Sequence, residues 1–166
     1  MSKPKSLPMA RSKKGNEELK DACSHLYYEY VMFRSVVSGI LSCFCTKGWL
    51  ANAMIESFVI HLRVLIDFFY PSGNPREDDV IAGDYFDDTS NWESIRPAIS
   101  GLLDEARKRA HKDLAHLTYT RISRGDEEKK WAFSDLINEL DCLMKLFQRK
   151  ASKNALCPQL LDLFKP

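Results

Sequence analysis

The sequence predicts an all-α fold, an antiparallel bundle of four long helices plus a short C-terminal helix. Apolar residues recur at helical spacing in four segments, and glycine, proline or charged turns separate these segments. No segment shows the strict alternation of a half-buried strand. The chain has 166 residues, 45% of them apolar, which suffices for one domain with its own core. We expect a flexible basic tail over 1–15 and a single bundle domain over 16–166.

The first two predicted helices are the most apolar. In the helix over 17–45, apolar positions recur in alternating steps of four and three, which is typical of a coiled-coil stripe. Lys47 and Gly48 form its stop signal. The second helix spans 49–70 and ends before Pro71. It is apolar around most of its circumference, which predicts a position at the centre of the bundle.

The third predicted helix follows a long acidic connection over 76–93. A connection of this length is unusual in a bundle, so it is either functional or packed as a lid. Its acids lack the spacing of a calcium-binding loop, and we expect them to be solvated. The helix itself spans 94–120, with Pro97 tolerated in its first turn.

The remaining helices are shorter. The fourth spans 134–150 and is expected to begin at a cap formed by Ser134 or Asp135. Pro158 then begins the short final helix, which runs through Phe164.

Composition excludes several classes of protein. With 24 basic and 23 acidic residues, the chain has no overall field that would attract nucleic acid or acidic lipid. The longest apolar run is too short to cross a bilayer, and no apolar stretch follows the basic start, so we expect a cytoplasmic protein with no membrane partner. Five scattered cysteines indicate small buried side chains in a reducing compartment. No Gly-rich phosphate loop is present, and we expect no cofactor.

Polar residues interrupt the second helix along one narrow stripe. At 100° per residue, Glu56, Arg63 and Asp67 fall on the same side, and Arg63 and Asp67 are four apart and can pair. Two interpretations stay open. The stripe is the solvent-facing side, or it is a polar network or cleft reaching the third helix, where stranding a carboxylate would cost a few kcal/mol. His61 lies away from the stripe and is expected to be hydrogen-bonded in the core or at an interface.

The third helix carries a second polar set. Arg109 and His116 are seven apart, so they lie about 20° apart around the helix and two turns apart along it. Asp113 lies between them, and His111 lies on a different flank with other polar residues. From spacing alone, an ordinary surface ladder of ion pairs is the simpler interpretation.

These residues resemble the signature of the HEPN superfamily, the higher eukaryote and prokaryote nucleotide-binding domains. That signature is an Arg, four to six residues and a His on one late helix. Here six residues separate Arg109 from His116, and the segment ends in Ala115-His116. The resemblance implies a small α-helical bundle that acts as a metal-independent endoribonuclease in a toxin or defence system. It also implies RNA as substrate and a homodimer whose two motifs face each other.

The chemistry of such a reaction suits these residue types. Cleavage without metal needs a base for the 2′-hydroxyl, an acid for the leaving oxygen and a cation for the phosphorane. His116 would transfer protons, Arg109 would clamp the phosphate, and Asp113 would orient His116. One such His per chain is few for two proton transfers, which is a chemical reason to expect the homodimer.

Two alternative interpretations do not involve RNA cleavage. Family members often carry Asn, Asp or His directly after the Arg, where this chain has Ala110. An alignment on the Ala-His ending puts the family's Arg on Ala110 itself, which would make the chain a non-catalytic interaction or antitoxin-like module with a protein partner. The third interpretation is a carboxylate-bridged metal bundle, which needs a carboxylate-x-x-His pair from two helices. Only one is present, and we expect no metal site. In such a metal bundle, the ligands would be Glu56, Asp67, Asp113 and His116.

Overall fold

The computed structural model describes residues 11–42, 48–115 and 130–165. All regular structure within these ranges is helical, which confirms the predicted all-α class. The elements in chain order are α1 (Asn16–Ser42), α2 (Trp49–Phe69), the 3-10 turn η1 (Ala82–Tyr85), α3 (Thr89–Ile95), α4 (Gly101–Ala115), α6 (Phe133–Lys150), the 3-10 turn η2 (Lys153–Ala155) and α7 (Pro158–Asp162).

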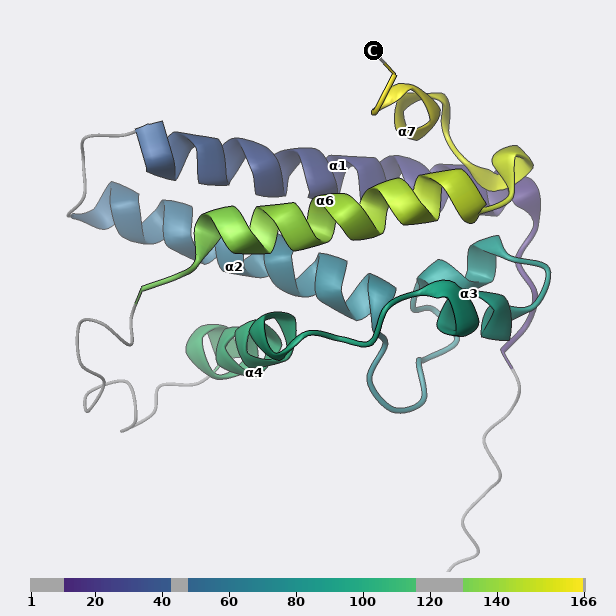
Figure 1. Cartoon of the computed structure of the whole chain (residues 1–166), viewed down its shortest axis with the longest axis horizontal. Coiled ribbons are helices and arrows are strands. Elements are labelled where there is room, and N and C mark those ends of the chain that lie inside the picture. Colours follow the sequence, from purple (N-terminus) through teal and green to yellow (C-terminus); the bar gives the residue numbers. More distant parts are fainter. Residues whose placement is uncertain (1–10, 43–47, 116–129, 166) are drawn as a thin grey trace, which may run out of the picture.

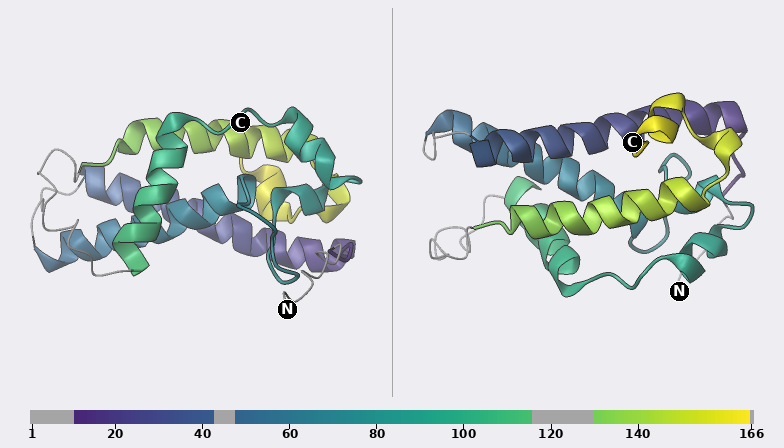
Figure 2. Two further views of the ribbon diagram at one scale, coloured as in Figure 1. Left: turned by 90° about the horizontal axis from the view of Figure 1, so that it is seen from below. Right: turned by 45° about the horizontal axis from the view of Figure 1, so that its top comes forward.

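Three of the described helices lie lengthwise and one lies across them. In Figure 1, α1 runs in the opposite direction to α2 and α6, and α4 is seen nearly end-on. The view from below in Figure 2 shows α4 crossing the molecule from the side of α6 towards α2, against which it packs. The arrangement therefore places α4, the helix that carries Arg109, across the other three helices.

The buried stripe of α1 follows the predicted steps of four and three. Its inward positions have no more than a few per cent of their surface exposed. The helix begins at Asn16 and its described part ends at Ser42, while the predicted end at 45 lies outside the described residues. The buried positions are Leu19, Cys23, Leu26, Tyr30, Phe33 and Val37.

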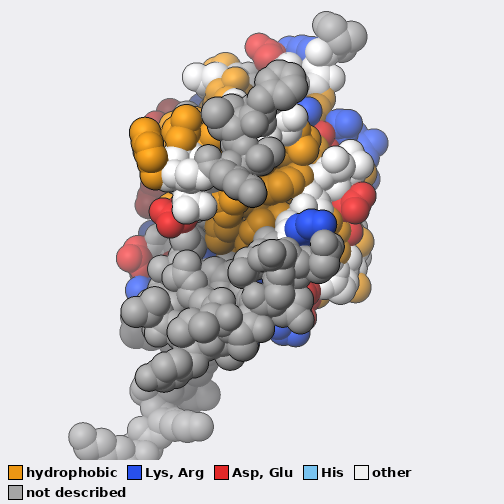
Figure 3. Space-filling view, turned by 90° about the vertical axis from the view of Figure 1, so that its left-hand side faces the viewer, with side chains coloured by type: hydrophobic (Ala, Val, Ile, Leu, Met, Phe, Trp, Pro, Cys, Tyr) orange, Lys and Arg blue, Asp and Glu red, His pale blue; other side chains and the backbone are white. Residues whose placement is uncertain are grey.

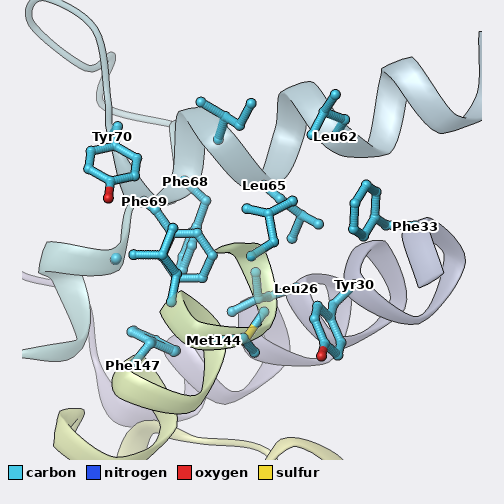
Figure 4. Close-up of a cluster of buried hydrophobic side chains, with 14 of the residues drawn as sticks. Leu26, Tyr30, Phe33, Leu62, Leu65, Phe68, Phe69, Tyr70, Met144 and Phe147 are labelled. Carbon is cyan, nitrogen blue, oxygen red and sulfur yellow. The ribbon is translucent and has the colours of Figure 1, made fainter. Parts of the chain in front are cut away.

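Aromatic side chains from α1, α2 and α6 meet in the core (Figure 4). Phe147 of α6 is central: its ring centroid lies 5.2 Å from those of Phe68 and Tyr85, and 5.9 Å from that of Trp92, all in edge-to-face geometry. Each such pair contributes about 0.5–1.5 kcal/mol beyond the area that it buries. This cluster fixes η1 and α3 against the long helices.

The predicted third helix is wrong at its start. α3 ends at Ile95, and Arg96 adopts an extended conformation (φ −70°, ψ 145°). The cause is Pro97, whose ring clashes with a helical conformation of the preceding residue. The chain becomes helical again at Gly101, where the Ser100 hydroxyl accepts a hydrogen bond from the Leu103 amide (3.0 Å) and caps α4.

Two smaller boundaries also differ from expectation. α6 begins at Phe133 after Ala132, and no side chain caps it, so the expected cap at Ser134 or Asp135 is wrong. α7 ends at Asp162 instead of continuing through Phe164. Such ends shift by one or two residues because the last turns of helices fray.

The central part of the acidic connection is packed on the core. A packed lid is one of the two interpretations that the sequence allows for this segment. Tyr85 is buried, and its hydroxyl donates a hydrogen bond to the carbonyl of Leu19 (3.0 Å). A Cβ on Gly83 would lie 2.3 Å from the Thr89 methyl carbon, so the turn passes α3 too closely for a side chain. Arg11, from the predicted basic tail, reaches back to pair with Asp84 (3.1 Å). The end of that tail is thus held by the connection.

Candidate functional site

Arg109, the candidate phosphate clamp, lies in the second half of α4 and is half-buried. Its Nη1 donates a hydrogen bond to the backbone carbonyl of Lys130 (2.6 Å), and its guanidinium carbon lies 3.8 Å from the centre of the Trp131 ring. A guanidinium over an aromatic face gains about 0.5–1 kcal/mol at exposed sites. Arg109 therefore joins α4 to the segment that leads into α6.

The partner residues of the motif are described only in part. His116 follows the last described residue of α4, Ala115, and lies outside the described residues. Asp113 belongs to α4 by its backbone, but its side chain also lies outside the description. His111 is exposed on α4. The expectation that Arg109 and His116 share one face therefore stays a prediction.

Two further cations near the middle of α4, Arg107 and Lys108, pair with one carboxylate. Asp104 lies 2.6 Å from Lys108 Nζ and 2.9 Å from Arg107 Nη2. The hydrogen bond from Lys108, followed by that from Arg107, holds the pKa of Asp104 below its ordinary value. The Asp104 carboxylate in turn raises the pKa of Lys108. An anionic ligand would compete with Asp104 for both cations.

Side chains from α3 and α4 satisfy the last carbonyls of α2, a feature that the sequence did not reveal. The Phe69 carbonyl accepts hydrogen bonds from Trp92 Nε1 (2.9 Å) and Arg96 Nη1 (3.2 Å). The Tyr70 carbonyl accepts one from Arg107 Nη1 (3.1 Å). Carbonyls at a helix C-terminus lack partners within the helix and attract cations. Trp92 and Arg96 thus attach the end of α3 to the C-terminal end of α2, and Arg107 attaches α4 to it.

The polar stripe of α2 lies on its outer side. Arg63 and Asp67 pair as predicted, at 3.4 Å, and the side chain of each is 40% exposed. Both line a cavity of about 660 Å³ whose other wall is formed by residues of segment 71–81. Glu56 is exposed about two turns before Arg63. Among the described residues, no hydrogen bond or ion pair carries these three side chains to α4. The solvent-facing interpretation is thus favoured over a network reaching that helix.

Apolar side chains share this outer side, so the expected central position of α2 is only half right. The inner face is buried, but Trp49 is 81% exposed, Ile60 48% and Val64 42%. By length and composition α2 could cross a membrane. Of the 18-residue stretch of α2 that is apolar enough to do so, 33% is buried within the molecule. Its outer face is thus a mixed surface of apolar and charged groups. We call it the α2 outer face, made of Trp49, Ala53, Glu56, Ile60, Arg63, Val64 and Asp67.

His61 behaves as the sequence predicts. It is buried, and its Nδ1 lies 2.6 Å from the carboxylate of Glu29 on α1. The ring of Tyr28 packs edge-on against it, at 6.0 Å between centroids. The pair joins α1 to α2 and lies apart from the α2 outer face.

The residues of the metal interpretation are not brought together where the structure describes them. Within the described ranges, no three or more His, Cys, Asp and Glu side chains lie close enough to hold one ion. Glu56 is exposed, Asp67 pairs with Arg63, and the other two ligands of that interpretation lie outside the description.

Comparison with known proteins adds no relative. No family model, no curated protein and no solved structure matches the chain. The fold and the residues described above define an all-α domain in which α4 carries several cations and the α2 outer face exposes both apolar and charged side chains.

Proposed function

We propose that the chain is a HEPN-like α-helical domain and that α4 carries the site of a metal-independent endoribonuclease of a toxin or defence system. The observation that supports this is the unbroken helix from Gly101 to Ala115. If the helix continues by one residue, His116 lies about 20° around the axis from Arg109 and two turns beyond it. Both side chains would then reach one phosphodiester group.

The contacts of Arg109 give its proposed role a specific form. Its fork matches phosphate oxygens and stays charged at every physiological pH. In the structure, that guanidinium lies on Trp131 and donates to the Lys130 carbonyl, so an RNA phosphate has to compete with this carbonyl. His116 transfers protons in this proposal, Asp113 orients it, and a homodimer in the cytoplasm supplies the second His.

The test is cleavage of a structured RNA pool in chelator by the full chain. We expect His116→Ala to abolish cleavage and to leave the helix intact, because Ala favours helix. Arg109→Lys keeps the charge, loses the fork and should reduce the rate at least tenfold. His25→Ala, at an exposed histidine of α1, is the matched control and should cleave like the wild type. Cleavage that survives in His116→Ala, or folded wild type inert on every RNA, contradicts the assignment.

A second candidate function is a non-catalytic interaction or antitoxin-like module. The α2 outer face supports it, because exposed apolar groups beside charged ones are typical of protein contacts. The engagement of Arg109 by Lys130 and Trp131 also supports it. In this case the RNA assay stays negative for every variant, while substitutions on α2 impair binding of the partner.

A further inference from the structure

The α2 outer face is the largest set of apolar side chains that the described residues leave uncovered on one helix. At 100° per residue, Trp49, Ile60 and Val64 lie within about 60° of one another. Glu56 and Arg63 lie on the same face, and Glu56 has no described hydrogen bond or ion pair. Exposed apolar side chains beside charged ones on one face are typical of protein contact surfaces.

The pattern on this face matches itself when one copy is reversed. In an antiparallel pair with a two-fold axis at Ile60, residues equally far before and after Ile60 face each other. Glu56 lies four residues before Ile60 and Arg63 three after it, so each Glu56 comes within one residue, about 1.5 Å along the helix, of the level of an Arg63 of the other copy. The Ile60 side chains meet at the axis. Two ion pairs then flank an apolar centre, whereas a parallel pair would put like charges opposite each other.

The same operation brings an exposed tryptophan to a cavity. Trp49 lies eleven residues before Ile60, and Pro71, on the wall of the 660 Å³ cavity, lies eleven after it. Trp49 stands at the end of the molecule where α1 ends and α2 begins, an end at which apolar side chains gather (Figure 3). At 1.5 Å per residue, Trp49 lies about 16 Å from the axis and Phe69, the last residue of α2, about 14 Å, so the indole comes to the end of the other copy's α2, beside the wall of its cavity. Buried aromatic anchors in pockets dominate the energy of protein interfaces.

We infer that the α2 outer face binds a second copy of this chain, through antiparallel α2 helices related by a two-fold axis at Ile60. The interface consists of an Ile60–Ile60 contact, two Glu56–Arg63 ion pairs and two Trp49 side chains in the cavities beside Pro71. This contact is separate from the facing motifs of the proposed ribonuclease, and it holds whether or not α4 cleaves RNA.

Charge exchange tests this interface in the full chain by sedimentation velocity from about 1 to about 100 μM. We expect a reversible wild-type dimer. Glu56→Arg and Arg63→Glu should each weaken association at least tenfold, because each puts like charges opposite each other. The double variant restores both pairs with reversed polarity and should return to within about threefold of the wild type. Recovery in the double variant requires that the two residues meet across the interface.

Apolar substitutions provide the second readout. Ile60→Ser and Trp49→Ala should weaken the dimer, whereas Ile95→Ser, at an exposed isoleucine of α3, is the matched control and should not. Circular dichroism verifies that each variant is folded. A wild type that is monomeric at every concentration overturns the inference, as does a double charge variant that remains monomeric. Wild type that floats with phospholipid vesicles, or that associates without loss in Ile60→Ser, overturns it as well. RNA cleavage is measured separately, so failure of the dimer and failure of the proposed activity are distinguishable.

Discussion

Cys23 shows how burial controls the chemistry of a single side chain. Its Sγ lies 3.1 Å from the Sγ of Cys157 and accepts a hydrogen bond from the Cys157 amide (3.1 Å). Burial is the main cause that raises the pKa of the Cys23 thiol from 9.0 to about 12. The expectation of buried cysteines is thus confirmed for these two, but it is wrong for Cys142, which is exposed on α6. Cys43 and Cys45 lie outside the described residues.

These thiols should therefore react at very different rates. At pH 8, iodoacetamide should modify Cys142 in the folded protein and leave Cys23 unmodified, because the reactive species is the thiolate and Cys23 is buried and protonated. Peptide mass spectrometry after a timed quench measures both sites. A sample unfolded in urea is the control and should react at both. Equal rates at both sites in the folded protein would contradict the structure.

At the scale of elements, the end of α2 and its outer face differ in what they contribute to stability. Arg107 donates a hydrogen bond to the Tyr70 carbonyl at the end of α2 and pairs with Asp104. Arg63, in contrast, belongs to a surface ion pair, and its side chain is 40% exposed. Unpaired carbonyls at a packed helix end cost more than an exposed ion pair. The stability of the fold thus depends on the anchored end of α2, and its outer face is available for binding.

Two substitutions compare these positions. Arg107→Met should lower the free energy of unfolding by about 1–2 kcal/mol, because it strands the Tyr70 carbonyl. Arg63→Met should change it by less than about 0.5 kcal/mol, well short of the few kcal/mol that the sequence predicts for a network. Urea unfolding measured at low protein concentration compares them. A larger loss for Arg63→Met than for Arg107→Met would show that the stripe on α2 is structural.

The sequence predicts elements well where one periodic face dominates, as in α1. The helix predicted over 94–120 is wrong at Pro97, because a proline is compatible both with the first turn of a helix and with a break between helices. The packing of Trp92 against the end of α2 decides between the two, and the sequence does not show that contact. The site is harder to predict. Spacing along α4 singles out Arg109, but its contact with Trp131 joins residues far apart in the sequence, and helical periodicity carries no information about such contacts.

At the scale of the whole molecule, buried tyrosines link stability to alkaline pH. Tyr30 donates to Asp141 (2.7 Å), and Tyr85 donates to Leu19. Burial raises the pKa of both phenols above their ordinary value of 10.0. Each side chain stays protonated in the folded state at a pH where the unfolded chain has already lost the proton. The folded state therefore binds more protons than the unfolded state above about pH 9–10.

The free energy of unfolding should therefore fall as pH rises through this range. These groups contribute fully below the pKa of the unfolded chain, about 9 for Cys23 and about 10 for the tyrosines, and each loses about 1.4 kcal/mol per pH unit above it. Urea unfolding with reductant at pH 7, 9 and 10.5 measures the decline. In Tyr85→Phe the decline should be shallower. Constant stability up to pH 10.5 would contradict the burial of these groups.

The contact of Cys23 with Cys157 also has a consequence for the order in which the protein is made. The two residues are 134 positions apart, and η2 and α7 pack on α1. A nascent chain presents α1 long before the ribosome has added the residues that cover it. Apolar surface around Leu19 and Cys23 thus stays uncovered during most of synthesis, when it can bind chaperones or aggregate. The fold can close only after this last segment has been made, and contacts between residues so far apart in the sequence slow folding.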